Sequence, residues 1–261
     1  MKLKVFITAI LLVSGSAFLQ AQDNPQDARQ ATTVRQRPTP EQMEAYKKAM
    51  DEQLRNDWAN LKRYREDNAK IGLPADREAR VVFMGNSITD YWINTMPEFF
   101  AGKSYIDRGI AGQTTPQMLI RFRQDVIDLK PKVVVILAGI NDINGNNGPS
   151  TLEMIEDNIK SMTELAQANN IKVVLSSVLP CDSIFVRPDL HPAERVLKLN
   201  DWIQKYASAK GCGYIDYFPG LADEGNGLKK EYSSDGVHPN KAGYLVMAPL
   251  AEKAIKKALN K

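Results

Sequence analysis

Four short segments of this chain carry the functional groups that acyl transfer requires. Three of them offer a serine hydroxyl and separate hydrogen-bond donors, and the fourth adds a carboxylate and an imidazole. They are residues 85–89, 109–112, 139–142 and 235–239, which read Gly-Asn-Ser-Ile-Thr, Gly-Ile-Ala-Gly, Gly-Ile-Asn-Asp and Asp-Gly-Val-His-Pro. Any one of these segments alone is a weak signal. Their order, and their positions just after predicted strands or on a late loop, combine them into one hypothesis.

The chain has only two histidines, so the choice of a general base is narrow. His238 follows Asp235 by three residues, in a glycine- and proline-containing turn that can place the acid beside the imidazole. An acid bonded to one ring nitrogen fixes the tautomer and leaves the other nitrogen to accept a proton from a serine hydroxyl. We therefore predict His238 as the base, the alternative being an exposed histidine of a turn. His191 precedes a proline that we expect to open a helix, so we place His191 at the entrance of the site or on a surface loop.

Ser87 is the predicted nucleophile, although for this residue taken alone the cap of a following helix is an alternative. Gly85 permits a tight turn just before it. The backbone N–H groups of Ser87 and Gly112 and the side-chain amide of Asn141 would form an oxyanion hole of three donors. Asp142 is expected to hold its loop rather than to take part in the chemistry.

Other motifs are disfavoured. The order Ser, Asp, His also fits an α/β-hydrolase, but the nucleophile elbow of that fold has glycine where this chain has Thr89. Walker-type and dinucleotide-binding glycine signatures are missing from the sequence, so nucleotide chemistry has no support. Neither cysteine has the spacing of a metal site, and we expect no metal and no cofactor. Cys181 and Cys212 could pair in a disulfide if they lie within reach.

The elements that must position these segments alternate between short strands and helices. Strands are predicted at residues 80–84, 104–107, 132–138, 172–179 and 213–216. Helices are predicted at residues 115–129, 150–169 and 192–209 and after Asn240, with a break or kink at Pro249. The third strand is apolar on both faces, which is typical of the middle of a sheet covered by helices on both sides. This alternation predicts an α/β fold, doubly wound around a five-stranded parallel sheet, with its site at the carboxyl ends of the strands.

The start of the chain predicts export. Residues 1–21 have the charged, apolar and small-residue regions of a secretory signal, with cleavage expected near Gln22 and an uncleaved anchor as the alternative. The apolar run is too short to span a bilayer comfortably, and no cysteine follows it that could carry a lipid anchor. We expect an exported protein, periplasmic or secreted if bacterial, without stable membrane insertion after the signal is removed. Cleavage removes two lysines and no acidic residue, so the formal net charge falls from +3 to +1 and argues against nucleic-acid binding.

Two further segments precede the predicted catalytic domain, residues 80–261. Residues 22–38 are polar, lack apolar periodicity and are expected to form a flexible leader. From Thr39, which can cap a helix, apolar residues recur every three or four positions as far as Lys70. Residues 39–79 are therefore predicted to form a long N-terminal helix and a connection. We expect the helix to pack on the catalytic domain, with a partner-binding role as the alternative.

The four segments resemble blocks I, II, III and V of the SGNH (GDSL-like) hydrolase superfamily, and the resemblance runs from about Arg80 to the C-terminus. It implies a flavodoxin-like three-layer α/β/α sandwich and a metal-independent esterase mechanism. It also implies the nucleophile, its two partners and the oxyanion donors, which are respectively Ser87, Asp235 with His238, and Ser87 with Gly112 and Asn141. One position departs from the family pattern, since Asn86 stands where the family commonly has Asp. That side chain is not a triad member, so the change concerns local hydrogen bonding.

The substrate is predicted from the surroundings of these residues. Aromatic and amide groups suit a sugar ring, and the candidate contacts are Tyr91, Trp92, His191 and Tyr232, although the first two could equally pack a helix. Export and the family resemblance favour removal of O-acetyl or other short acyl groups from carbohydrates, so the expected partner is a small-molecule or glycan ester. Lysophospholipase or thioesterase action is the enzymatic alternative. A catalytically silent glycan-binding module is the alternative from another class, and the oligomeric state is left open.

Overall fold

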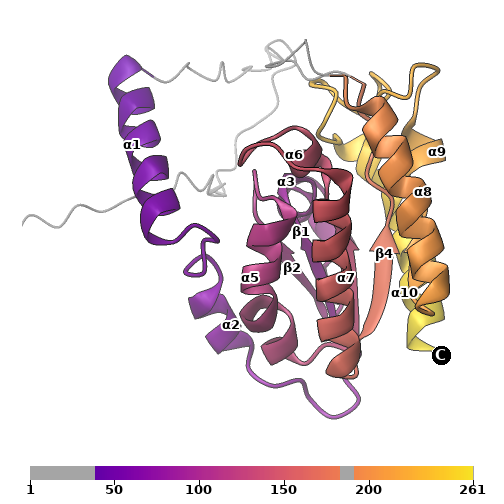
Figure 1. Ribbon diagram of the computed structural model, residues 1–261. Coiled ribbons are helices and arrows are strands. Elements are labelled where there is room, and N and C mark those ends of the chain that lie inside the picture. Colours follow the sequence, from indigo (N-terminus) through magenta and orange to yellow (C-terminus); the bar gives the residue numbers. More distant parts are fainter. Residues whose placement is uncertain (1–38, 183–190, 261) are drawn as a thin grey trace, which may run out of the picture. The chain divides into compact units, whose positions relative to one another are not determined.

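The computed structural model describes residues 39–182 and 191–260 (Figure 1). The predicted signal and leader lie outside these residues. The described residues divide into two units between Ala45 and Tyr46. Within the described ranges, no helix combines the length and the apolar character needed to cross a membrane.

Five parallel strands of the second unit form one sheet in the order β2-β1-β3-β4-β5. Their bounds are Val81–Gly85 for β1, Tyr105–Gly109 for β2, Val133–Leu137 for β3, Lys172–Ser176 for β4 and Gly213–Ile215 for β5. Every residue of β1 and β3 is buried. This is the burial pattern of central parallel strands with both faces covered, as the apolar run of the third strand predicts.

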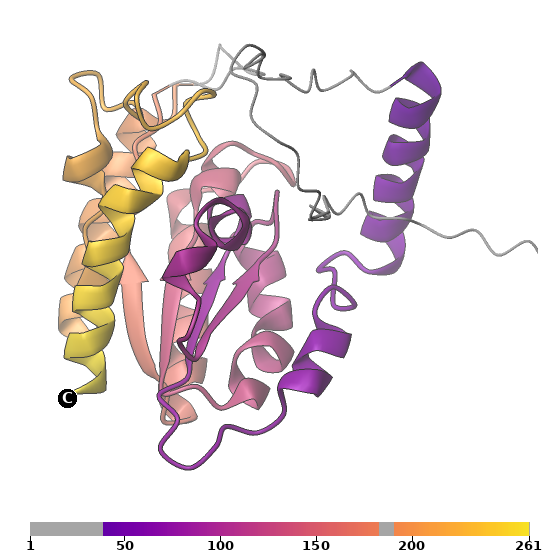
Figure 2. The same cartoon turned by 180° about the vertical axis from the view of Figure 1, so that it is seen from behind.

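Helices cover both faces of the sheet. On one face α5 (Thr115–Asp125), α7 (Leu152–Ala168) and α8 (Ala193–Ala209) pack in a row, and α5 and α7 stand in front of the sheet in Figure 1. On the other face lies α10 (Lys241–Leu259), which is in front in Figure 2. Short helices follow the strand ends, namely α3 (Ser87–Asp90), α4 (Trp92–Thr95), α6 (Ile140–Ile143) and α9 (Phe218–Leu221), and 3₁₀ turns lie at Pro97–Phe99 and Ile127–Leu129. The three-layer α/β/α sandwich is thus confirmed.

The sequence predicts a break or a kink at Pro249, and α10 continues through this residue without a break. Proline removes one backbone hydrogen bond of a helix, the one that would reach the carbonyl of Leu245. Both Pro249 and Leu245 are exposed, so water can satisfy that carbonyl. Meanwhile the opposite side of α10 is held by burial of residues such as Tyr244 and Met247.

The long N-terminal helix predicted over residues 39–70 is instead two helices, α1 (Pro40–Asn56) and α2 (Arg65–Ile71). Its start is as predicted, because the N–H of Gln42 donates to Thr39 Oγ1 at 3.2 Å and the Gln42 side chain accepts from the Thr39 N–H. The break comes at Asp57, whose carboxylate accepts from the N–H groups of Leu61 and Lys62 at 2.7 and 3.0 Å. These contacts compete with helix continuation, which is the usual effect of a short acidic side chain.

The segment between α1 and α2 is tied to α5 and to the loop before it. Three glutamine side chains donate to its backbone carbonyls at 2.7 Å each, namely Gln113 to Ala59, Gln117 to Trp58 and Gln124 to Leu61. Helix α2 itself contacts α5. These bonds attach the segment from residue 58 to residue 71 to the same unit as the sheet.

The two cysteines do not form a disulfide. Cys181 is buried in the core, whereas Cys212 lies before β5, 3.6 Å from the Nε2 atom of Gln167. The pairing that the sequence leaves open is therefore absent from the structure.

Candidate active site

Ser87, Gly112 and Asn141 lie on the same rim of the sheet, because each follows the carboxyl end of a parallel strand. Ser87 is the first residue of α3, two positions after β1, and only 5% of its surface is exposed. Asn86 caps this helix, since its side-chain oxygen accepts from the N–H of Ile88 at 3.0 Å. The local hydrogen bond at Asn86 is thus a helix cap, and it holds the turn that presents Ser87.

Two glycines allow this turn to pack tightly. A Cβ atom at Gly85 would lie 2.0 Å from Thr89 Oγ1, and one at Gly109 would lie 2.0 Å from the backbone nitrogen of Asp90. Neither separation is possible for non-bonded atoms. Residue types without a side chain are therefore required where the ends of β1 and β2 meet α3.

The structure brings Ser87, His238 and Asp235 into one hydrogen-bonded chain. Ser87 Oγ lies 2.9 Å from His238 Nε2, and His238 Nδ1 lies 2.7 Å from Asp235 Oδ2. A carboxylate at Nδ1 favours the tautomer with the proton on that nitrogen. The other ring nitrogen is then an acceptor facing the serine hydroxyl, which is the arrangement that general-base activation of a serine requires.

The Asp235 carboxylate is stabilised in its ionised form. Burial acts to raise the pKa of Asp235, but hydrogen bonds from the backbone N–H of His238, from its imidazole and from the N–H of Val237 outweigh it. The pKa is consequently lowered to about 2. Asp235 therefore remains a carboxylate at neutral pH and can stabilise a positive charge on the imidazole.

Ser233 organises the turn that carries this pair, a part of the site that the sequence analysis missed. Its buried hydroxyl donates to Asp235 Oδ1 at 3.1 Å and accepts from the N–H of Gly236 at 3.0 Å. Gly236 has φ +77°, a left-handed conformation that glycine adopts without steric cost. A serine two residues before an Asp-Gly pair is the available sequence signal, since serine hydroxyls commonly close such turns.

Two of the three predicted oxyanion donors are backbone groups. Gly112 has φ +79° in a turn closed by the bond from the N–H of Gln113 to the carbonyl of Ile110 at 3.3 Å. No atom lies within 4 Å of where a Cβ of Gly112 would be, so a substrate can approach the backbone there. Among the described residues, the N–H groups of Ser87 and Gly112 donate to no carbonyl or side chain.

The third donor, the Asn141 side chain, is held in place by the neighbouring loop. Its Nδ2 atom donates one hydrogen to the carbonyl of Gln113 at 2.9 Å, and an amide nitrogen has a second hydrogen to give. Asp142 accepts from both the N–H and the hydroxyl of Thr115, at 3.0 and 2.6 Å, and burial raises its pKa to about 6. Asp142 thus links the Asn141 loop to the start of α5, which is a structural contact.

The sequence of this chain matches a known protein family. Residues 83–246, more than half of the chain, match the family model of the GDSL-like Lipase/Acylhydrolase family. The chain belongs to this family. Membership of this family implies that the chain hydrolyses ester bonds, in agreement with the resemblance seen in the sequence.

Solved structures of two Bacteroides proteins are similar over nearly their whole length. A GDSL-like lipase from Bacteroides thetaiotaomicron is 45% identical, with a TM-score of 0.76, and the match covers 77% of this chain and 100% of that one. A protein from Bacteroides fragilis assigned as an acylhydrolase is also 45% identical, with a TM-score of 0.77 and coverage of 78% and 99%. An acetylxylan esterase of Geobacillus stearothermophilus, Axe2, shares the fold at 18% identity, a TM-score of 0.56 and coverage of 68% and 94%.

A curated relative matches over a shorter stretch. The uncharacterized lipoprotein YqeF of Bacillus subtilis is 29% identical over 93 residues, which are 34% of this chain and 38% of that protein. The match therefore spans well under half of the lipoprotein. A segment related to this chain therefore occurs in a protein that is named a lipoprotein.

The four residues predicted to contact substrate in this acylhydrolase-family chain have different positions. The Tyr91 ring lies 5.2 Å from the His238 ring, centroid to centroid, and Tyr91 is 42% exposed. Trp92, in contrast, is 2% exposed and stacks on aromatic side chains of the core, Phe99 and Tyr244. The prediction of a substrate contact at Trp92 is corrected accordingly, since neighbouring residues of a helical turn point in different directions.

His191 and Tyr232 are not joined to the triad-like chain by any described contact. His191 is exposed, just before α8. Tyr232 is half-buried, packs against the core, and its carbonyl accepts from the N–H of Asn240, which caps α10. Its contacts are those of a residue that supports the turn carrying Asp235.

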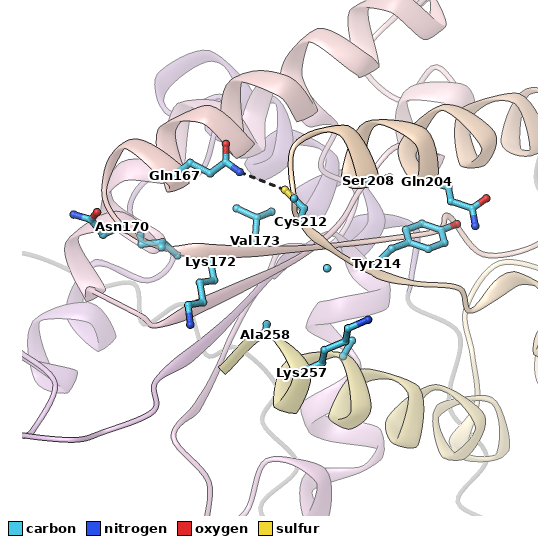
Figure 3. A pocket seen from close by; sticks show the side chains of 14 residues that line it. Gln167, Asn170, Lys172, Val173, Gln204, Ser208, Cys212, Tyr214, Lys257 and Ala258 are labelled. Carbon is cyan, nitrogen blue, oxygen red and sulfur yellow. Dashed lines mark hydrogen bonds between the residues drawn. The ribbon is translucent and has the colours of Figure 1, made fainter. Parts of the chain in front are cut away.

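A cavity of about 620 Å³ lies away from this rim (Figure 3). Its lining includes Lys172 at the start of β4 and Cys212 beside β5, with Gln167 pointing to the Cys212 sulfur. Since parallel strands begin at this edge, the cavity is at the end of the sheet opposite to Ser87. Among residues 39–182 and 191–260, no cluster of three histidine, cysteine or acidic side chains could hold a metal ion.

Proposed function

We propose that this chain is a serine esterase in which Ser87 is acylated and then deacylated by water. The observation that carries the proposal is the chain of short contacts from Ser87 Oγ to His238 Nε2 and from His238 Nδ1 to Asp235 Oδ2, at 2.9 and 2.7 Å. The N–H groups at Ser87 and Gly112 and the amide of Asn141 support it. Together they supply the nucleophile, base and oxyanion donors of acyl transfer.

In the first half of the proposed reaction, Ser87 Oγ attacks the ester carbonyl as His238 Nε2 takes the hydroxyl proton. The carbonyl oxygen becomes an oxyanion and accepts hydrogen bonds from the three donors. The tetrahedral intermediate then breaks its bond to the alcohol oxygen, which receives the proton from His238, and the acyl-enzyme remains. In the second half, water loses a proton to His238, attacks the acyl carbonyl, and Ser87 leaves with that proton.

The proposed substrates are short acyl esters on carbohydrates. The exposed Tyr91 beside His238 offers an aromatic face, and the backbone at Gly112 is open to an approaching ester. The family's esterase chemistry and the fold shared with an acetylxylan esterase are consistent with this class. A signal-like N-terminus and a lipoprotein relative support export, which would expose the enzyme to glycans outside the cell.

Replacement of Ser87 by alanine tests the proposal directly. We expect Ser87→Ala to reduce p-nitrophenyl acetate hydrolysis by about three orders of magnitude or more, because the nucleophile is lost. The thermal unfolding midpoint should stay near that of the wild type. Ser161→Ala is the matched control and should be fully active, because the Ser161 hydroxyl lies at the surface and donates to the carbonyl of Asp157 in its own helix.

Labelling with a fluorophosphonate separates an enzyme from a silent binding module. The phosphorus should attach to the Ser87 oxygen with loss of fluoride, and peptide mapping should find the adduct on Ser87 alone. Undiminished turnover by Ser87→Ala, or an adduct at a different serine, would refute the proposed function.

A further inference from the structure

A fully buried ion pair beneath the site is not used by the proposed reaction. Arg121 and Asp125, one turn apart on α5, both have 0% side-chain exposure and are 3.0 Å apart. Burying two charges costs desolvation free energy, and well-packed apolar residues of similar size usually stabilise a core as well or better. Stability alone therefore does not account for this pair, whereas the guanidinium offers directional hydrogen bonds that apolar residues lack.

Arg121 makes three hydrogen bonds, one within α5 and two to different parts of the rim. Nη1 donates to Asp125, Nη2 donates at 2.9 Å to the carbonyl of Gly85, and Nε donates at 2.5 Å to the Oε1 atom of Gln113. Asp125 in turn accepts from Asn68 Nδ2 at 2.8 Å. The guanidinium is planar and rigid, so these partners are fixed relative to one another.

The Gly85 bond connects Arg121 to the nucleophile. The carbonyl of Gly85 begins the turn that leads through Asn86 to Ser87, and it also accepts from the N–H of Ile110 at 3.1 Å. A shift of this carbonyl would move the backbone N–H of Ser87. Arg121 therefore holds the first donor through the main chain.

The Gln113 bond connects Arg121 to the other two donors. Gln113 directly follows Gly112 and closes its turn, and its carbonyl accepts from the Asn141 amide at 2.9 Å. The position of the Gln113 side chain thus governs the Gly112 N–H and the Asn141 amide together. The Arg121 guanidinium is thus connected to the N–H of Ser87 and to the N–H of Gly112 by one hydrogen bond and the main chain. It is connected to the Asn141 amide by two hydrogen bonds through Gln113.

We propose that Arg121 is the positioning residue of the oxyanion hole, acting through the carbonyl of Gly85 and the side chain of Gln113. This inference rests on the proposed serine-esterase function. The donors strengthen their bonds only when the oxyanion forms, so their misplacement lowers kcat and leaves KM nearly unchanged. A displacement of about 1 Å in such a constellation is enough to cost about 100-fold in rate.

The test compares two identical substitutions of glutamines that bond to the same segment. Gln113→Met removes the acceptor of Arg121 and the bond to the carbonyl of Ala59. Gln124→Met removes the equivalent bond to the carbonyl of Leu61 and a longer bond of 3.4 Å to Asp125 Oδ1, but it leaves the three hydrogen bonds of Arg121 and the Gly112 turn in place. Both variants lose one hydrogen bond to the segment between α1 and α2. Only Gln113→Met also loses the hydrogen bond from Arg121.

For p-nitrophenyl acetate we expect Gln113→Met to lower kcat about 10- to 100-fold, with KM changed by less than about threefold. Its rate of phosphonylation by a fluorophosphonate should fall in parallel, because the phosphoryl oxygen occupies the position of the oxyanion. Gln124→Met should keep wild-type kcat. Equal kcat values in the two methionine variants would overturn the proposal.

A second variant keeps the test decisive if Gln113→Met unfolds at the assay temperature. Gln113→Glu retains an oxygen acceptor for Arg121 but has no N–H for Ala59, so kcat should stay within about threefold of the wild type. A kcat loss of 10-fold or more in a folded Gln113→Glu protein would show that the Arg121 bond is not the one that matters. Ser87→Ala, assayed alongside, distinguishes failure of the positioning role from failure of the proposed function. If Ser87→Ala is inactive while Gln113→Met and Gln124→Met have the same kcat, only the positioning role is refuted.

Discussion

Asp235 accepts more hydrogen bonds than the orientation of one imidazole needs. Its Oδ2 atom faces His238 Nδ1, while Oδ1 accepts from the N–H groups of Val237 and His238 at 2.9 and 2.8 Å and from the Ser233 hydroxyl. The carboxylate therefore builds its own turn as well as facing the ring. This double use ties the ring position to the local backbone.

Substitution of Asp235 by asparagine separates the two uses. Asparagine can still accept the backbone N–H groups through its oxygen, but its NH₂ would face His238 Nδ1 and favour the tautomer with a proton on Nε2. That tautomer cannot accept the Ser87 proton, so we expect Asp235→Asn to lower kcat by about 10⁴. The exposed Asp201→Asn is the control, and a kcat of Asp235→Asn within 10-fold of the wild type would argue against the proposed base.

The residues that could be named from sequence are those with a chemical signature. Ser87, His238 and Asp235 are recognisable by a hydroxyl, an imidazole and a carboxylate, and the structure places these groups in contact. Gln113 and Arg121 carry no such signature, because their importance comes from tertiary contacts between a loop and α5. The distinction between exposed Tyr91 and buried Trp92 also depends on how α4 packs, which the sequence does not specify.

At the scale of elements, β2 contains a buried carboxylate, Asp107, with a raised pKa. Asp107 Oδ1 accepts from the N–H of Gly109 at 2.7 Å, and its Oδ2 atom has no hydrogen-bond partner among the described residues. Burial, with a smaller contribution from the charge of Asp90, raises the pKa of Asp107 to about 7, although the Gly109 N–H and nearby arginines act to lower it. In an unfolded chain an aspartate titrates near pH 4.

The raised pKa of Asp107 predicts how stability depends on pH. Between about pH 4 and pH 7 the folded protein holds a proton here that the unfolded chain releases, so this group makes folding more favourable as pH falls through that window. Its contribution is at most about 1.4 kcal/mol per pH unit. In Asp107→Asn, which is neutral at every pH, the free energy of unfolding should rise less on going from pH 7 to pH 5 than in the wild type.

Urea unfolding followed by circular dichroism at several pH values measures this difference. Asp142, whose pKa is raised to about 6, contributes in the same direction in both proteins and cancels from the comparison. Asp201→Asn, at an exposed ion pair, serves as the control and should retain the wild-type slope. Identical slopes for Asp107→Asn and wild type would show that Asp107 is ionised in the folded state at these pH values.

Elements were predictable where a residue pattern has a direct physical cause. The apolar run of β3 and the alternation of strand and helix predict the sheet. The observed strands differ from the predicted ones only in where they begin and end. The break at Asp57 was missed, because the apolar periodicity continues across it while the carboxylate captures two backbone N–H groups. At Pro249 the helix is not broken, since packing of the buried side of α10 outweighs one missing hydrogen bond.

At the scale of the whole molecule, the expectations for the segment before residue 39 remain predictions. The signal over residues 1–21 and the leader over residues 22–38 lie outside the described residues, so export depends on composition and on a partial relative. The formal net charge of +3 and its change on cleavage are too small to suggest a polyanionic partner. The proposed substrate class therefore depends on the residues around the site.

The acyl preference of the enzyme tests that argument. A long acyl chain needs a buried apolar groove beside Ser87, where each methylene would gain about 0.8 kcal/mol. The cavity of about 620 Å³ is at the opposite edge of the sheet and cannot receive a chain attached to Ser87. Because the proposed substrates carry short acyl groups, we expect kcat/KM to fall from p-nitrophenyl acetate to the butyrate and octanoate esters. Release of acetate from acetylated xylo-oligosaccharides should be faster than hydrolysis of lysophosphatidylcholine. With Ser87→Ala as the blank, a kcat/KM that rises with chain length would favour a lysophospholipase instead, because only a chain-binding groove converts added methylenes into transition-state binding.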